Sequence, residues 1–282
     1  MSDLLTGFFT PWVLYALITV LHLVLPGRWI DGYVRDPGTG EPLRYRLNGF
    51  RVLIAMVALW AVAGATGTVP FDFLWTHRWA SLAGACTFGL IFSGAIVSLN
   101  ESTGKHPLAD FYLGRLENPQ LWGGRLDAKM WLYLIGAVML ELNVLSFVAH
   151  HWMTFPGDPS AGVFLVAAML TWFVCDYLWF EHVHLWTYDL FAERVGFKLG
   201  WGCLTFYPFF YAVGLWSVVE QPDPETPWVL LPLIAMVFFT GWSLARGANM
   251  QKWFFKTNPT RRFLGIPQRG ITDGTKTLLA SG

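Results

Sequence analysis

The chain has 282 residues, of which 54% are hydrophobic, 17% aromatic and only 13% charged, whereas soluble domains carry about 25% charged residues. Nineteen basic and nineteen acidic side chains give a formal net charge of zero, and 16 residues are tryptophan. This composition excludes a disordered chain and a basic nucleic-acid-binding protein, and it predicts an integral membrane protein.

Seven stretches of the chain come close to the roughly 20 apolar residues that a bilayer-crossing helix needs. They cover approximately residues 8–26, 52–69, 80–99, 130–152, 160–180, 197–219 and 228–245. The first stretch is expected to remain as a span, because no basic residue precedes it and no small-residue cleavage site follows it. We therefore expect an all-α, polytopic membrane helix bundle with about seven spans.

The positions of the basic residues predict how this bundle is oriented. If the N-terminus is outside, every Lys and Arg except Arg78 falls in a connection on the cytoplasmic side, as the positive-inside rule requires. Adding or removing one internal span would destroy this partition. We expect residues 1–245 to form the bundle and residues 246–282 to form a basic cytoplasmic segment, in either a bacterial inner membrane or the endoplasmic reticulum.

The densest polar cluster of the sequence follows the fifth predicted span, at residues 176–194. Wound as one helix, it places polar side chains on two adjacent stripes: Tyr177, Glu181, His184 and Tyr188 on one, and His182, Trp186, Asp189 and Glu193 on the next. A helix end dissolved in cytoplasm would give this pattern. So would a polar pocket in which a carboxyl group with a raised pKa donates a proton.

Two of the predicted spans contain unusual residues. The sixth combines Gly200, Gly202 and Pro208, which indicates either broken backbone facing protein or a water-filled cavity, or close packing through small residues. The fourth carries Glu141 and Asn143 at mid-depth. A carboxyl group there is a candidate functional site or the partner in an interhelical hydrogen bond, for example with Asp176 or a tryptophan.

Cations follow the last predicted span, where Asn249, Lys252 and Lys256 share one helical face. The pattern is more typical of a positive flank that meets anionic lipid head groups, although a cationic pair of this kind can also hold a phosphate.

No metal site is expected. His150 and His151 are predicted at the outer surface and His182 and His184 at the inner one, a full span apart. Every lysine lies at a membrane edge or outside, which argues against a retinal protein, and no Gly-x-Gly-x-x-Gly fingerprint for a nucleotide occurs.

Four stretches carry recognisable motifs: YRLNGFRVL at 45–53, HPLADFYLGRLENP at 106–119, LWFEHVHLWTYDLFAERVGFKLGWGCLTFYPFFYA at 178–212 and GANMQKWFFKTNP at 247–259. In this order they resemble the N-terminal part of the sterol reductase family, which includes delta-14 and delta-7 sterol reductases and the membrane domain of lamin B receptor. The third and fourth stretches are the specific ones.

The resemblance implies an enzyme that uses NADPH to reduce a carbon–carbon double bond of a sterol or related isoprenoid, by protonation followed by hydride transfer. It implies three groups of site residues: Glu181, His182 and Asp189 for catalysis, with Asp189 or Glu181 as the acid; Trp186, Thr187 and Tyr188 in the substrate pocket; and Asn249, Gln251, Lys252 and Lys256 at the cofactor. The expected partners are a sterol or other hydrophobic small molecule and membrane lipids.

The chain also departs from the family's pattern. Lys256 stands where the family has arginine, and Trp186 replaces the first threonine of a Thr-Thr pair. The family continues beyond residue 282 into a segment that completes the NADPH pocket, so we expect residues 246–282 to lead into that region and residues 1–282 alone to show no turnover.

A second function therefore stays open. The chain could be a non-catalytic membrane subunit or scaffold with a reductase-like fold, which binds a lipid or pigment or packs against the helices of a second polypeptide.

Overall fold

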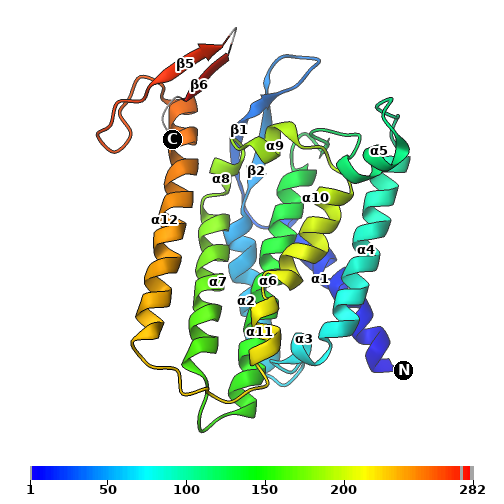
Figure 1. Cartoon of the computed structure of the whole chain (residues 1–282). Coiled ribbons are helices and arrows are strands. Elements are labelled where there is room, and N and C mark those ends of the chain that lie inside the picture. Colours follow the sequence, from blue (N-terminus) through cyan, green and yellow to red (C-terminus); the bar gives the residue numbers. More distant parts are fainter. Residues whose placement is uncertain (1, 274–275, 280–282) are drawn as a thin grey trace.

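The computed structural model describes residues 2–273 and 276–279, and it is mostly helical (Figure 1). Five of its helices are long and apolar enough to cross a membrane: α1 (Ser2–Val24), α4 (Arg78–Ser98), α6 (Ala128–Thr154), α7 (Ala161–Trp179) and α12 (Leu230–Thr257). The prediction of a membrane helix bundle is confirmed at this level.

The two other predicted spans take a different form. The second is α2 (Gly49–Ala65), a shorter apolar helix of 17 residues. The sixth consists of three consecutive pieces, namely α10 (Phe197–Trp201), the π-helix η1 (Gly202–Phe210) and α11 (Val213–Val218). Seven crossings therefore stay a prediction.

The expectation of an all-α fold missed three small antiparallel hairpins. They pair β1 (Arg28–Arg35) with β2 (Pro42–Leu47), β3 (Gln120–Leu121) with β4 (Leu126–Asp127), and β5 (Gly270–Asp273) with β6 (Lys276–Leu279). The turn of the first hairpin is built by Asp36, whose side chain accepts the backbone N–H groups of Gly38 and Thr39. The Asp-Pro-Gly-Thr-Gly run at 36–40 was the turn signal in the sequence.

Short helices cap the two ends of the bundle. Figure 1 shows the β1–β2 hairpin, α5 (Pro107–Leu113), α8 (Glu181–His184) and α9 (Tyr188–Ala192) at one end, together with the β5–β6 hairpin. The N-terminus, α3 (Phe73–Thr76) and α11 lie at the other end. The first end carries the connections that the sequence predicts to be cytoplasmic.

Helix α6 forms the centre of the bundle and α12 its edge. In the most apolar 18-residue window of each helix, 83% of the α6 residues are buried, whereas none of the α12 residues are. Helix α6 packs against α1, α2, α3, α7 and η1, and α12 packs against α7 and α8.

The irregular sixth segment is held by hydrogen bonds from regular helices. The side-chain amide of Asn143 donates to the carbonyl oxygen of Pro208 at 2.9 Å, and the Tyr15 hydroxyl donates to the carbonyl oxygen of Leu204. Asn143 therefore ties α6 to η1. Glu141 accepts from the hydroxyl of Thr171 on α7 at 2.9 Å, which is an interhelical hydrogen bond, one of the two interpretations of this carboxyl group, although the partner is neither Asp176 nor a tryptophan.

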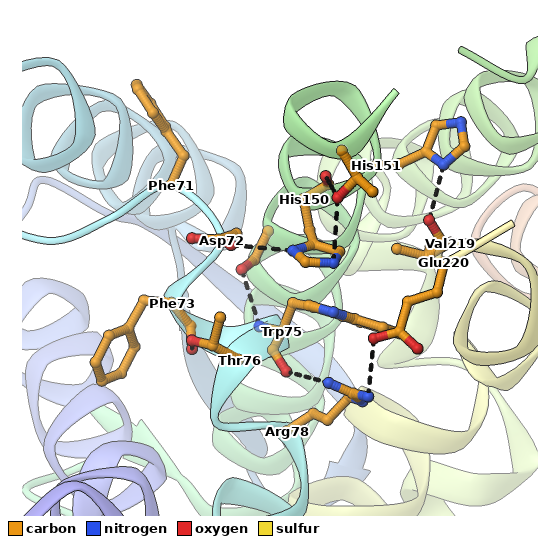
Figure 2. Close-up of polar contacts among 12 residues, drawn as sticks. Phe71, Asp72, Phe73, Trp75, Thr76, Arg78, His150, His151, Val219 and Glu220 are labelled. Carbon is orange, nitrogen blue, oxygen red and sulfur yellow. Dashed lines mark hydrogen bonds and ion pairs between the residues drawn. The ribbon is translucent and has the colours of Figure 1, made fainter. Parts of the chain in front are cut away.

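A polar cluster closes the end of the bundle opposite the hairpins (Figure 2). His150 Nδ1 lies 3.0 Å from a carboxylate oxygen of Asp72. The guanidinium of Arg78 donates to the carbonyl oxygen of Trp75 through Nη1 and to the carboxylate of Glu220 through Nη2. His151 donates to the carbonyl oxygen of Val219 and accepts the backbone N–H of Ser160. Both histidines thus have protein partners, and the described residues contain no group of His, Cys, Asp or Glu that could hold a metal ion.

Candidate functional site

A cavity of about 840 Å³ lies between α7, the α8–α9 segment and α12. This volume suits a small ligand, since such sites measure about 300 to 1,000 Å³. Seven of the residues assigned to the site from the sequence line it: Trp186, Thr187, Tyr188, Asp189, Asn249, Lys252 and Lys256. They come from two segments that are about sixty residues apart in the chain.

The single helix expected over residues 176–194 is wrong. Helix α7 ends at Trp179, and the chain forms α8, a turn and then α9. The side chain of His184 folds back on α7, where its Nε2 lies 3.1 Å from the carbonyl oxygen of Tyr177 and its ring lies 4.0 Å from the Tyr177 ring, centroid to centroid. Burial lowers the pKa of His184 to about 4, so the ring is neutral at pH 7.

Because the helix breaks there, the predicted catalytic residues face two cavities. Asp189 lines the large cavity, whereas Glu181 and His182 line a neighbouring one of about 320 Å³ with Arg28 and Arg51. Both carboxylate oxygens of Glu181 accept the backbone N–H of Gly49, at 3.1 and 3.2 Å, so this side chain caps the start of α2. The structure brings Asp189 and Lys252 together and places Glu181 apart from them.

Burial shifts the pKa values of both residues in the smaller cavity. It raises the pKa of Glu181 to about 7, although the Gly49 N–H and the charge of Arg28 act in the opposite direction. It lowers the pKa of His182, and the charges of Arg28 and Arg246 lower it further. The carboxyl of Glu181 is therefore able to carry a proton near neutral pH.

The two predicted cofactor lysines have different surroundings. Lys252 is exposed at the cavity, whereas Lys256 is half-buried. The ammonium of Lys256 lies 4.1 Å from the Tyr33 ring centroid and 4.4 Å from that of Phe191, and 3.4 Å from the carbonyl oxygen of Trp186. Such cation–π contacts hold a lysine in place. The half-buried Gln251 is not among the residues that line the cavity.

Tyr33 reaches this site from the β1–β2 hairpin, and the sequence analysis missed it. Its ring packs against Trp186 and Phe191, with centroids 5.5 and 5.1 Å apart, and its backbone N–H donates to the carbonyl oxygen of Leu185. No motif points to this contact, because it depends on how the hairpin folds over the α8–α9 segment. Tyr177 and His184 were noticed as polar but not assigned to the pocket, and they line it as well.

An ion pair fastens α12 to α7 at the wall of the cavity. The guanidinium of Arg246 contacts the carboxylate of Asp176 through both Nε and Nη2, with Nε 3.1 and 3.0 Å from the two oxygens. The side chains are only 12% and 7% exposed. The sequence analysis treated Arg246 simply as a basic residue of the cytoplasmic segment, whose predicted start at residue 246 falls inside α12.

These features define a mostly helical membrane protein with a polar, cation-bearing cavity at one end of the bundle. Residues 5–282 match the ERG4/ERG24 family of ergosterol biosynthesis. The chain belongs to this family of membrane sterol reductases, and the resemblance expected from its motifs is confirmed.

Similar proteins come from distant organisms. The chain is 28% identical to a delta(14)-sterol reductase of Arabidopsis thaliana over 95% of its length, 28% identical to one of Methylotuvimicrobium alcaliphilum over 98%, and 30% identical to one of Mus musculus over 99%. It spans 73%, 65% and 69% of the lengths of these three relatives.

Proposed function

We propose that this chain is the membrane core of an NADPH-dependent reductase that acts on a carbon–carbon double bond of a sterol or related isoprenoid. The observation that carries the proposal is the shared cavity. Residues 186–189 and 249–256 belong to two separate family motifs, and side chains from both line one space next to the α7–α12 interface. The family's delta(14)-sterol reductases supply the substrate class.

The chemistry requires an acid beside an apolar surface. An isolated alkene accepts hydride poorly, so a proton must first be added to create a carbocation; bound NADPH would then supply the hydride. Asp189 is the acid favoured by position, because it lines the cavity that also contains Phe173, Val237 and Trp242. Glu181 with His182 is the alternative acid pair, favoured by the raised pKa of Glu181, and it would serve a substrate that reaches the smaller cavity.

The residues at the α12 side of the cavity fit the polar parts of NADPH. Lys252 is an exposed cation there, suited to a phosphate, and Asn249 adds an amide one turn earlier. Gln251 belongs to the same motif. Lys256, held against Tyr33 and Phe191, would position the wall rather than reach freely for a phosphate. Trp186, Thr187 and Tyr188 would border the substrate from the opposite side.

The second candidate function is a non-catalytic membrane subunit that binds lipid or pigment, or packs against a second polypeptide. The aromatic surroundings of Lys256 favour this second function. The Tyr33 and Phe191 rings contact the ammonium of Lys256, which leaves Lys252 as the cation of the cofactor motif that is exposed at the cavity.

The test is a coupled assay with NADPH and a delta-14 sterol, run on the purified chain alone and on the chain joined to the segment that completes the NADPH pocket in the family. The reductase proposal expects NADPH oxidation in proportion to sterol reduced, measured by absorbance and mass spectrometry, only when that segment is present. Replacing Asp189 with Asn should slow turnover by about a hundredfold or more, and Lys252→Met should raise KM for NADPH by about tenfold. Lys198→Met is the matched control, since Lys198 pairs with Glu193 outside the cavity and should leave both constants unchanged.

Co-purification of a sterol without any sterol-dependent NADPH oxidation, even when the completing segment is present, would contradict the reductase proposal and support the non-catalytic subunit. Equal activity of the Asp189→Asn variant and the unchanged chain would remove Asp189 as the acid and direct the same test to Glu181→Gln.

A further inference from the structure

Two further cavities lie along α7. One contains Glu181 and His182, and the other shares Asp176 and Trp242 with the large cavity. The first is the small polar cavity of about 320 Å³ that contains Arg28, Arg51 and Glu181. The second is an apolar groove of about 320 Å³, lined by Phe50, Trp172, Cys175, Asp176, Trp179, Phe180 and Trp242. Phe50 and Trp179 line both, and their rings meet edge to face with centroids 5.0 Å apart.

The apolar groove lies at membrane depth and faces outward. It follows α7 from Trp179 back to Trp172, a distance of about 10 Å along the helix axis, within a helix that is apolar enough to span a bilayer. Trp179 is 62% exposed and Trp172 is 43% exposed, so neither is buried by the protein. The one charged residue of the groove, Asp176, is already paired with Arg246.

The polar cavity lies at the end of the same helix and is cationic. Arg28 and Arg51 are both exposed. Arg51 donates to the carbonyl oxygen of Pro26 through Nη1. Neither Arg28 nor Arg51 forms an ion pair among the described residues. Glu181 does not neutralise them fully, because its carboxyl accepts the Gly49 N–H at the start of α2, and burial raises its pKa to about 7, so that it is only partly ionised at neutral pH.

We propose that these two cavities together bind one anionic glycerophospholipid, with its phosphodiester at Arg28 and Arg51 and an acyl chain along the groove between α2, α7 and α12. Arginine suits this role because its guanidinium contacts phosphate oxygens in a bidentate manner. Basic clusters beside the end of a membrane helix attract anionic lipids. The exposed tryptophans match the aromatic residues that gather at membrane interfaces.

The polar cavity adjoins the apolar groove, and this arrangement distinguishes a bound lipid from a free phosphate ion. A free anion would need only the arginines, whereas a lipid also needs an apolar path that leads from the cation site into the membrane. The Phe50–Trp179 ring pair provides that continuity, because it borders both spaces.

The experiment measures which lipids stay bound to the full chain in native mass spectrometry. The detergent-purified chain is exchanged into mixed micelles with equal amounts of dioleoyl phosphatidylglycerol and dioleoyl phosphatidylcholine. The proposal expects phosphatidylglycerol to be retained preferentially and Arg28→Gln to reduce its retention by about fivefold. Arg35→Gln is the matched control, since Arg35 lies at the other end of β1 and outside the cavity, and it should have no effect.

Two further variants separate the parts of the site and guard against misfolding. Arg28→Lys keeps one positive charge and should retain most of the lipid, whereas Trp179→Ala should lose lipid although both arginines remain. Equal retention of the two lipids by the unchanged chain, or unchanged retention in both Arg28→Gln and Trp179→Ala, would overturn the proposal. Displacement of the lipid by about 10 mM inorganic phosphate would overturn the proposal as well. This concentration is about ten times the dissociation constant of about 1 mM that is expected for weak binding of a free phosphate ion.

Discussion

Glu181 illustrates how one residue serves structure and chemistry at the same time. Its carboxylate accepts the first N–H of α2, which is where helix ends need an acceptor, and burial raises its pKa from the ordinary 4.5 to about 7. A raised carboxyl pKa means that the folded chain holds a proton that the unfolded chain releases. Stability is then highest below pH 4.5, falls as the pH rises from 4.5 to 7, and is constant above that range.

This linkage predicts that the free energy of unfolding decreases by roughly 3 kcal/mol between pH 4.5 and pH 7.5 through Glu181. Glu181→Gln keeps an oxygen for the Gly49 N–H and cannot ionise, so this part of the pH dependence should vanish. Denaturant unfolding in detergent at the two pH values measures it. The same slope in the Gln variant and the unchanged chain would show that other groups cause it.

The contact between α6 and η1 depends on Gly136, which has no side chain to hold the two elements apart. A Cβ added at Gly136 would lie 2.4 Å from the ring of Tyr207 and 2.8 Å from the carbonyl oxygen of Cys203, so one of the two elements would have to move. Gly136→Ala should therefore destabilise the chain by about 1 to 3 kcal/mol. Gly202→Ala is the matched control in η1, because a Cβ there meets open space, and it should change stability by less than about 0.5 kcal/mol. Thermal unfolding of the two variants side by side measures the difference, and equal midpoints would contradict this packing argument.

The elements differ in how far the sequence could predict them. Hydropathy located all five long membrane helices, because a bilayer-crossing helix leaves a long apolar stretch that needs no knowledge of its neighbours. The glycines and Pro208 of the sixth segment were consistent with a broken backbone and with close packing through small residues, and the structure shows consecutive pieces rather than one regular helix. The break after Trp179 was missed because it depends on His184 folding back onto Tyr177, and helical periodicity alone continues through it.

The candidate site was predictable to the same extent. Motif positions selected Asp189, Asn249 and Lys252, which line one cavity. Residues from elements without a motif were missed, such as Tyr33 of the β1–β2 hairpin beside Lys256. The pairing of Asp176 with Arg246 also escaped, because either residue could have bonded several others at the same depth.

For the whole molecule, the decisive prediction concerns the sixth crossing. Lys198 lies in the first turn of α10 and Gln221 follows α11, and both are exposed. If this segment crosses the bilayer, Lys198→Cys should react with a membrane-impermeant maleimide only after cells are permeabilised, whereas Gln221→Cys should react in intact cells. The variants are made in a chain whose Cys86, Cys175 and Cys203 are replaced by Ala. Labelling of both positions from one side would mean six crossings or fewer and would reverse the predicted orientation of α12.

The position of α12 at the edge of the bundle ties the candidate site to the physical state of its surroundings. This helix has 28 residues, which corresponds to a length of about 42 Å, whereas the hydrocarbon layer of a bilayer is about 30 Å thick. The excess of about 12 Å carries Lys252 and Lys256, so the end of α12 that borders the candidate site extends beyond the hydrocarbon layer. The wall with Asn249 and Lys252 therefore stands at the boundary between lipid and water, so that a sterol would enter the cavity from the membrane side whereas a phosphate-bearing cofactor would reach it from the aqueous side.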